Sequence, residues 1–237
     1  MSILKIENYS KSYNGSKKAA DNVSLTVESG DIYGFIGHNG AGKSTTIRAV
    51  VGVLDFNEGE IYIDGHSVKK DPLECKRLTA YIPDNPDLYE NLTGFQYLNF
   101  IADLFGVSSA DRKARIDEYA GKLEITDALG DPISSYSHGM KQKVAIISAL
   151  IHEPKLMVMD EPFVGLDPKA AYMLKEIMHD MCSRGSAVFF STHVLDVAEK
   201  LCNKVAIIKE GKILTQGTME ELVGDKSLEE VFLDQIT

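Results

Sequence analysis

Residues 37–44 read GHNGAGKS and match the phosphate-loop pattern G-x-x-x-x-G-K-[ST]. An apolar run of strand length, residues 32–36, precedes them, and helical spacing follows over residues 44–53. Strand, glycine-rich loop and helix is the context that this pattern requires. Glycines let the backbone curl so that successive N–H groups point at phosphate oxygens, and the helix N-terminus adds its positive end. Lys43 is therefore expected to reach the β- and γ-phosphates, and the Ser44 hydroxyl to bind Mg²⁺.

A second pattern lies downstream, where residues 156–161 read LMVMDE. A buried strand would carry its two terminal carboxylates to the carboxyl edge of a sheet, where open α/β sheets bind ligands. Asp160 is expected to hold Mg²⁺, and Glu161 to polarise the attacking water as a general base. The guanine pattern N-K-x-D is not found, since residues 203–206 read NKVA, and this argues against a GTPase.

Strand signals on both sides of a helical middle indicate the architecture. Apolar or alternating runs predict strands at residues 3–9, 23–27, 32–36, 156–159, 187–191 and 205–208. Residues 93–150 show mostly helical spacing. We therefore expect a parallel α/β core built from both halves of the chain, with an inserted helical lobe.

Composition narrows the class of protein. The 237 residues are 44% apolar and 25% charged, which is typical of a globular protein. A net charge of −10 disfavours nucleic-acid binding. No apolar run is long enough to span a bilayer, and no secretory signal is visible at the N-terminus. Three scattered cysteines fit buried thiols in a reducing cytosol. The expectation is a soluble cytoplasmic protein that reaches a membrane only through a partner.

Further motifs occur in a fixed order around these two. Residues 135–143 read SYSHGMKQK and open a helix, residues 165–168 read GLDP, residues 191–193 read STH, and residues 11–13 read KSY. Together they resemble the signature motif, D-loop, switch histidine and adenine-stacking loop of ABC-transporter ATPases. The resemblance covers residues 3–217.

The resemblance implies a fold and its division. The fold is α/β: a P-loop NTPase (RecA-like) core with an antiparallel β portion near the N-terminus and an inserted α-helical subdomain. Residues 1–237 would form one ABC ATPase domain. Its core would span residues 1–83 and 154–217, its helical subdomain residues 84–153, and its short helical tail residues 218–237.

The resemblance also implies a mechanism of Mg²⁺-dependent ATP hydrolysis. Two ATPase domains would pair head to tail, so that each ATP lies between one phosphate loop and the partner's signature helix. Glu161 and His193 would be catalytic, with His193 holding the γ-phosphate and the attacking water. Metal contacts would come from Ser44, Asp84 and Asp160. The expected ATP-binding residues are Tyr13, Gly37, Asn39, Gly40, Ala41, Gly42, Lys43, Ser44, Thr45, Ser137, Gly139 and Asp167.

The chain departs from the family pattern in three places. Asp84 stands where Gln is usual; it keeps an oxygen for Mg²⁺ but is shorter and charged. His138 and Met140 replace Gly and Gln in the signature motif. Residues 163–164, Phe-Val, replace smaller polar residues of the D-loop, which puts its hydrogen bonds across the dimer in doubt.

Partners follow from the same resemblance. A separate membrane-spanning subunit would contact residues 84–105, where Leu88, Tyr89, Leu92, Phe95 and Tyr97 look exposed. It would hold the chain at the cytoplasmic face of the cell membrane. The short amphipathic tail, residues 227–233, favours an exporter. Two alternatives stay open: a soluble ABC-type ATPase that acts as a clamp or regulator, and a nucleotide-sensing module without turnover.

Overall fold

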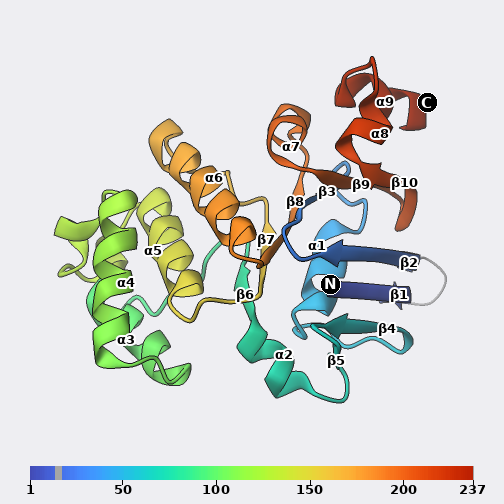
Figure 1. Ribbon diagram of the computed structural model, residues 1–237. Coiled ribbons are helices and arrows are strands. Elements are labelled where there is room, and N and C mark those ends of the chain that lie inside the picture. Colours follow the sequence, from blue (N-terminus) through green and yellow to red (C-terminus); the bar gives the residue numbers. More distant parts are fainter. Residues whose placement is uncertain (14–17, 237) are drawn as a thin grey trace. The chain divides into compact units, whose positions relative to one another are not determined.

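The computed structural model of the protein describes residues 1–13 and 18–236. It divides into two compact units (Figure 1). Unit 1 comprises Met1–Tyr81, Lys155–Pro162 and Met178–Thr237, and unit 2 comprises Ile82–Pro154 and Phe163–Ile177. No helix within the described ranges is both long enough and apolar enough to cross a membrane.

Two sheets form the framework of unit 1. The first is an antiparallel sheet in the order β2-β1-β4-β5, from the N-terminal part of the chain. The second has the order β10-β9-β3-β8-β7-β6 and draws its strands from both halves of the chain. The strands are β1 (Ser2–Ser12), β2 (Lys18–Glu28), β3 (Ile32–Ile36), β4 (Glu58–Ile63), β5 (His66–Ser67), β6 (Thr79–Ile82), β7 (Leu156–Asp160), β8 (Ala187–Thr192), β9 (Lys204–Lys209) and β10 (Lys212–Thr218).

Parallel pairing dominates the centre of the second sheet. Strand β3 runs parallel to both β8 and β9, and β7 runs parallel to β8. Every residue of β3, β7 and β8 is buried, because strands covered on both faces need apolar side chains on both. The predicted fold class, a parallel core with an antiparallel β portion near the N-terminus and an inserted helical part, is confirmed.

Helices flank these sheets in unit 1. They are α1 (Lys43–Val50), α2 (Pro72–Leu78), α7 (Leu195–Leu201), α8 (Met219–Val223) and α9 (Leu228–Ile236). Helix α1 contacts β7 and β8, whereas α7 contacts β3 and α9. The chain therefore ends in a helix, as the amphipathic pattern predicted.

Aromatic packing fills the space between the two sheets. Phe189 of β8 has no exposed surface, and its ring centroid lies 5.5 Å from that of Phe35 and 5.9 Å from that of Tyr33. Leu156, the first residue of β7, belongs to the same hydrophobic cluster. Strands β3, β7 and β8 therefore share one hydrophobic core.

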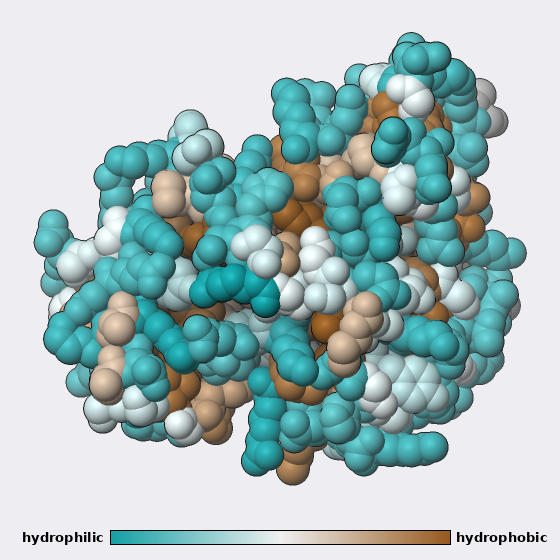
Figure 2. Space-filling model, viewed as in Figure 1, coloured by the Kyte–Doolittle hydropathy of each residue, from teal (hydrophilic) through white to brown (hydrophobic). Residues whose placement is uncertain are grey.

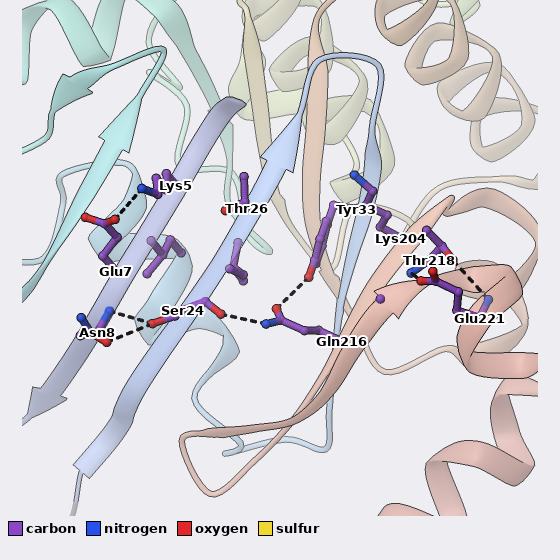
Figure 3. A pocket seen from close by; sticks show the side chains of 13 residues that line it. Lys5, Glu7, Asn8, Ser24, Thr26, Tyr33, Lys204, Gln216, Thr218 and Glu221 are labelled. Carbon is purple, nitrogen blue, oxygen red and sulfur yellow. Dashed lines mark hydrogen bonds and ion pairs between the residues drawn. The ribbon is translucent and has the colours of Figure 1, made fainter. Parts of the chain in front are cut away.

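A polar groove of about 590 Å³ lies where β1 and β2 approach the β9–β10 edge (Figure 3). The Gln216 amide bridges its two sides: its nitrogen donates to the Ser24 carbonyl at 3.2 Å, and its oxygen accepts from the Tyr33 hydroxyl at 3.3 Å. Three further pairs lie within the groove: Lys5 with Glu7 at 2.6 Å, Asn8 with Ser24, and Thr218 with Glu221. None of the residues expected to bind ATP lines this groove.

Unit 2 is helical, as residues 93–150 predicted. It contains α3 (Gly94–Leu104), α4 (Ser109–Lys122), α5 (His138–Leu150) and two 3₁₀ turns, Thr126–Ala128 and Ile133–Ser135; α6 (Pro168–Ser183) begins in it. Side-chain caps fix where the helices start. Thr93 and Gln96 form a reciprocal capping box on α3, and Ser108 caps α4.

The helical unit differs in extent from the expected residues 84–153, because it also takes in Phe163–Ile177. Ion pairs within the unit explain the difference. Lys169 pairs with Glu124, and Lys143 Nζ lies 2.9 Å from Asp167 Oδ2. These contacts join residues far apart in sequence, so a pattern of local spacing did not reveal them.

Removing side-chain volume from the core of unit 1 should destabilise it. Leu156 is fully buried, so Leu156→Ala should lower the free energy of unfolding by about 2–5 kcal/mol in urea titrations followed by circular dichroism. Leu73→Ala is the matched control, since Leu73 is 72% exposed and the same atoms are removed from the surface. Equal losses in the two variants would contradict this view of the core.

Candidate functional site

The phosphate loop joins β3 to α1 and lies close against neighbouring backbone. A Cβ added at Gly42 would lie 2.1 Å from the Ala19 carbonyl oxygen, and one at Gly37 would lie 2.4 Å from the Ile208 carbonyl oxygen. Gly42 also has φ +106° and precedes the first residue of α1. Only glycine tolerates both the close approach and the left-handed backbone here.

Lys43 is buried, with 5% of its side chain exposed. Its ammonium donates to the carbonyl oxygens of Gly37, at 2.7 Å, and His38, at 3.3 Å. It also lies 3.5 Å from Glu161 Oε1. A buried cation needs such partners, because desolvation without them is costly. The lysine is therefore held at the mouth of the loop by backbone oxygens and one carboxylate.

Glu161 follows β7 and has a left-handed backbone, with φ +49°. This conformation is strained for a residue with a Cβ and is concentrated at functional sites. The side chain is 13% exposed, and Oε1 lies 3.0 Å from Nδ1 of the half-exposed His193. The two residues expected to be catalytic therefore touch, and Lys43 lies on the same carboxylate.

Asp160 and Glu161 share a partner on the adjacent strand. Sheet register places Ser191 of β8 opposite Asp160. The Ser191 hydroxyl donates to Asp160 Oδ1 at 2.5 Å and accepts from the Glu161 backbone N–H at 3.1 Å. Ser191 belongs to the motif STH at residues 191–193, from which no role for its side chain was predicted. Its place at the end of a strand, two residues before His193, was the available signal.

Tyr13 is exposed, and its hydroxyl lies 3.4 Å from Thr45 Oγ1 in the first turn of α1. The Lys11 ammonium lies 5.6 Å from the Tyr13 ring centroid. Tyr9 contrasts with it, because Tyr9 is fully buried against Phe56 with ring centroids 5.2 Å apart. Burial raises the pKa of the Tyr9 phenol, as expected for a core residue. Tyr13, which follows β1, is thus the exposed tyrosine beside the phosphate loop.

The signature residues lie in unit 2, at the start of α5. Ser137 caps this helix and accepts from the Met140 N–H at 3.3 Å. A Cβ added at Gly165 would lie 2.3 Å from His138 Cδ2, and one at Gly139 would lie 2.9 Å from the Gly165 carbonyl oxygen. The signature turn therefore packs directly against the glycine of the D-loop.

Asp167 makes its contacts within unit 2. Its Oδ1 accepts from the Ala170 N–H at 2.8 Å at the start of α6, and its Oδ2 pairs with Lys143 of α5 at 2.9 Å. The backbone hydrogen bond from Ala170, with Lys143 second, lowers the pKa of the Asp167 carboxyl below its usual value. The carboxylate is thus charged and tied to the signature helix.

The structure brings together one part of the expected site within unit 1: Tyr13, the loop residues Gly37, Asn39, Gly40, Ala41 and Gly42, the α1 residues Lys43, Ser44 and Thr45, and Asp160, Glu161 and His193. Ser137, Gly139 and Asp167 belong to unit 2, as does the exposed Asp84. Among residues 1–13 and 18–236, no three His, Cys, Asp or Glu side chains gather closely enough to hold a metal ion by themselves.

The residues expected to be exposed in the partner-binding region lie only partly at the surface. Tyr89, Phe95, Phe100 and Leu104 are exposed in unit 2, whereas Leu88, expected at the surface, is buried. Figure 2 shows apolar side chains among hydrophilic ones over the part of this face where α3 and α4 lie. Tyr89 links this group, because its ring centroid lies 5.7 Å from that of Phe100.

A strand, phosphate loop and helix beside a strand-end carboxylate define a P-loop nucleotide-binding protein. Comparison with known proteins makes the class specific. The ABC transporter family profile matches residues 20–164. The ATP-binding protein EcsA of Bacillus subtilis (strain 168) is 36% identical over 236 residues, which cover 100% of this chain and 95% of EcsA.

A further relative and a solved structure indicate the same family. The bacitracin transport ATP-binding protein BcrA of Bacillus licheniformis is 36% identical, over 93% of this chain and 71% of BcrA. A solved structure of the ATP-binding subunit of an ABC transporter superposes with a TM-score of 0.95 at 33% identity, covering 99% of this chain and 100% of that one. The chain belongs to the ABC transporter family. It is an ATP-binding subunit with ATPase activity that powers transport through a membrane-spanning partner.

Removing the Ser191 hydroxyl should disturb both carboxylates at the strand end. Ser191→Ala breaks a charge-assisted hydrogen bond, so the free energy of unfolding should fall by about 1.5–3 kcal/mol. The kcat for ATP should fall by roughly tenfold, since about 1.4 kcal/mol of misplacement suffices for that. Ser183→Ala is the control, because Ser183 is exposed and bonds only to a helix carbonyl. A wild-type kcat in Ser191→Ala would contradict the role assigned to this hydroxyl.

Proposed function

We propose that the chain hydrolyses ATP at the group formed by Lys43, Glu161 and His193 and thereby drives export. The observation that carries the proposal is the Glu161 carboxylate, which lies 3.0 Å from His193 Nδ1 and 3.5 Å from Lys43 Nζ. A base, a ring nitrogen and a cation, brought together from α1 and from the ends of β7 and β8, are the groups that phosphoryl transfer to water needs.

Each of the three has a separate task. The Lys43 ammonium leaves the carbonyls of the loop for the β- and γ-phosphates, where its charge is better compensated. Glu161 accepts a proton from the attacking water. The contact of His193 Nδ1 with Glu161 Oε1 would hold the ring and leave its other nitrogen for the γ-phosphate. Tyr13 stacks on adenine beside Thr45.

The donors present fit Mg²⁺. The ion prefers hard oxygen ligands and is bound by one or two protein groups together with substrate phosphates. The Ser44 hydroxyl in the first turn of α1 and the buried Asp160 carboxylate supply such oxygens, and Asp84 would add a third. When bound, the ion would neutralise charge on the phosphates.

A second ATPase domain would complete the site. Helix α5 is 13 residues long, and its N-terminus carries Ser137 and Gly139. A helix N-terminus attracts anions through unpaired N–H groups and its dipole. In a head-to-tail dimer this end would meet the γ-phosphate bound to the partner chain. His138 packs on Gly165, so the D-loop and the signature turn would move as one piece.

The membrane-spanning partner would dock on residues 84–105, where Tyr89, Phe95, Phe100 and Leu104 supply exposed apolar surface. An apolar helix of a partner lies in such a surface through a few anchors. This docking would hold the chain at the cytoplasmic face of the cell membrane. Export is favoured because BcrA is named for bacitracin transport and a 32% identical relative, LnrL of Bacillus subtilis (strain 168), for linearmycin resistance.

Loss of the proposed base should stop turnover without stopping binding. Glu161→Gln removes the proton acceptor but keeps the shape, so kcat should fall by about 10²–10⁴-fold. Affinity for ATP should remain, and size-exclusion chromatography with ATP should show a stalled dimer. Glu176→Gln is the matched control, because Glu176 is exposed on α6. Rapid turnover by Glu161→Gln would refute the assignment of the base.

Docking can be tested by pull-down from detergent-solubilised membranes with mass spectrometry. The tagged wild-type chain should retain a polytopic membrane protein at near-equal stoichiometry. Leu104→Asp should lose it, whereas Leu73→Asp should not; the two leucines are similarly exposed, at 69% and 72%, and only Leu104 lies on the docking surface. A soluble pool with cytosolic partners alone would instead support a clamp or regulator.

A further inference from the structure

We propose that the C-terminal helix α9 braces the phosphate loop, with Phe232 as a positioning residue for nucleotide binding that acts through His38. The inference rests on the proposed function, because it takes the loop at residues 37–44 as the seat of the phosphates. Every residue that carries it lies in unit 1.

The brace is a direct ring contact. The Phe232 and His38 ring centroids lie 5.0 Å apart at an interplanar angle of 68°, an edge-on arrangement that aromatic rings favour. Phe232 is buried, with 6% of its surface exposed, although it lies within the last ten residues of the chain. His38 is exposed, so Phe232 covers only one side of its ring.

His38 also holds the catalytic lysine through its backbone. Its carbonyl oxygen accepts from Lys43 Nζ at 3.3 Å and from the Ala41 N–H at 3.1 Å. A shift of His38 would therefore move an oxygen that competes with phosphate for the Lys43 ammonium. The side chain of this residue is fixed by α9, and its main chain shapes the loop.

Helix α9 is itself well anchored. Ser227 and Glu230 cap its start reciprocally: the Ser227 N–H donates to Glu230 Oε2 at 2.7 Å, and the Glu230 N–H donates to Ser227 Oγ at 3.2 Å. Leu228 is fully buried, and Val231 is nearly so. The helix can therefore transmit position and is not a frayed end.

Helix α9 is also hydrogen-bonded to α7, the helix that follows His193. The Leu228 N–H donates to Glu199 Oε2 at 2.8 Å, and Glu199 lies on α7, which begins two residues after His193. Helix α9 thus touches the loop that precedes Lys43 and the helix that follows His193. One helix therefore contacts the segment before Lys43 and the segment after His193.

Removal of the Phe232 ring should weaken nucleotide binding more than it slows chemistry. Without the ring, His38 is free to move and the loop loses its preformed shape, whereas Glu161 and His193 keep their mutual contact. We expect Phe232→Ala to raise the Kd for a fluorescent ADP analogue, and the KM for ATP, by about 3–10-fold, with kcat within twofold.

A double-mutant cycle on the full chain separates positioning from simple loss of stability. Phe232→Ala, His38→Ala and the double variant should all show similar Kd values, because each breaks the same contact. Phe232→Tyr should restore binding to near the wild-type Kd. Val231→Ala is the control: it removes packing from the same helix and should lower Tm while leaving the Kd within twofold.

The outcomes are distinct. Any of three results would overturn the brace. Phe232→Ala could have the wild-type Kd, the double variant could raise the Kd by the product of the two single effects, or Val231→Ala could raise the Kd as much as Phe232→Ala does. Lys43→Ala tests the underlying proposal. If Lys43→Ala binds nucleotide normally, the assigned phosphate site fails; if it does not bind while Phe232→Ala is normal, only the brace fails.

Discussion

The rest of the structure depends on the close approach of the phosphate loop to the backbone around it. At Gly37 and Gly42 a Cβ would lie within 2.4 Å of a carbonyl oxygen from β9 or β2. The loop is therefore pressed into a fixed curve, and the Lys43 ammonium is directed onto the carbonyls of Gly37 and His38. A rigid loop can present its N–H groups to an anion without paying reorganisation entropy on binding.

Beside that loop, the end of β7 carries the carboxylates of Asp160 and Glu161, whose charge is opposite to that of Lys43. Parallel register places the ends of β7 and β8 side by side, so that Ser191 bonds to both Asp160 and the backbone of Glu161. The left-handed turn at Glu161 then brings its carboxylate towards His193 and Lys43. Local strain is tolerated because the buried strand before it and the bonds around it determine the geometry.

Contacts within unit 2 hold the signature turn and the D-loop together. The signature turn, the D-loop glycine and the Lys143–Asp167 pair form one packed group. Two departures from the family pattern fit this arrangement. His138 fits because Gly165 has no side chain, and Met140 fits because its backbone N–H still donates to Ser137 Oγ. The larger D-loop residues Phe163 and Val164 belong to the same unit, and Lys175 lies 5.6 Å from the Phe163 ring centroid.

The sequence by itself determined the phosphate loop, the acidic strand end, the parallel core and the helical insertion, because each follows from residue types at short, fixed spacing. It also distinguished the reactive groups Lys43, Glu161 and His193. Only the tertiary structure decided that Ser191 joins Asp160 to Glu161, that residues 163–177 belong with the helical unit, that Leu88 is buried and that Phe232 meets His38. These contacts join residues from 24 to 194 positions apart, or depend on which face packs inward, and such pairings are set by sheet register and core packing, which leave no local pattern in the chain.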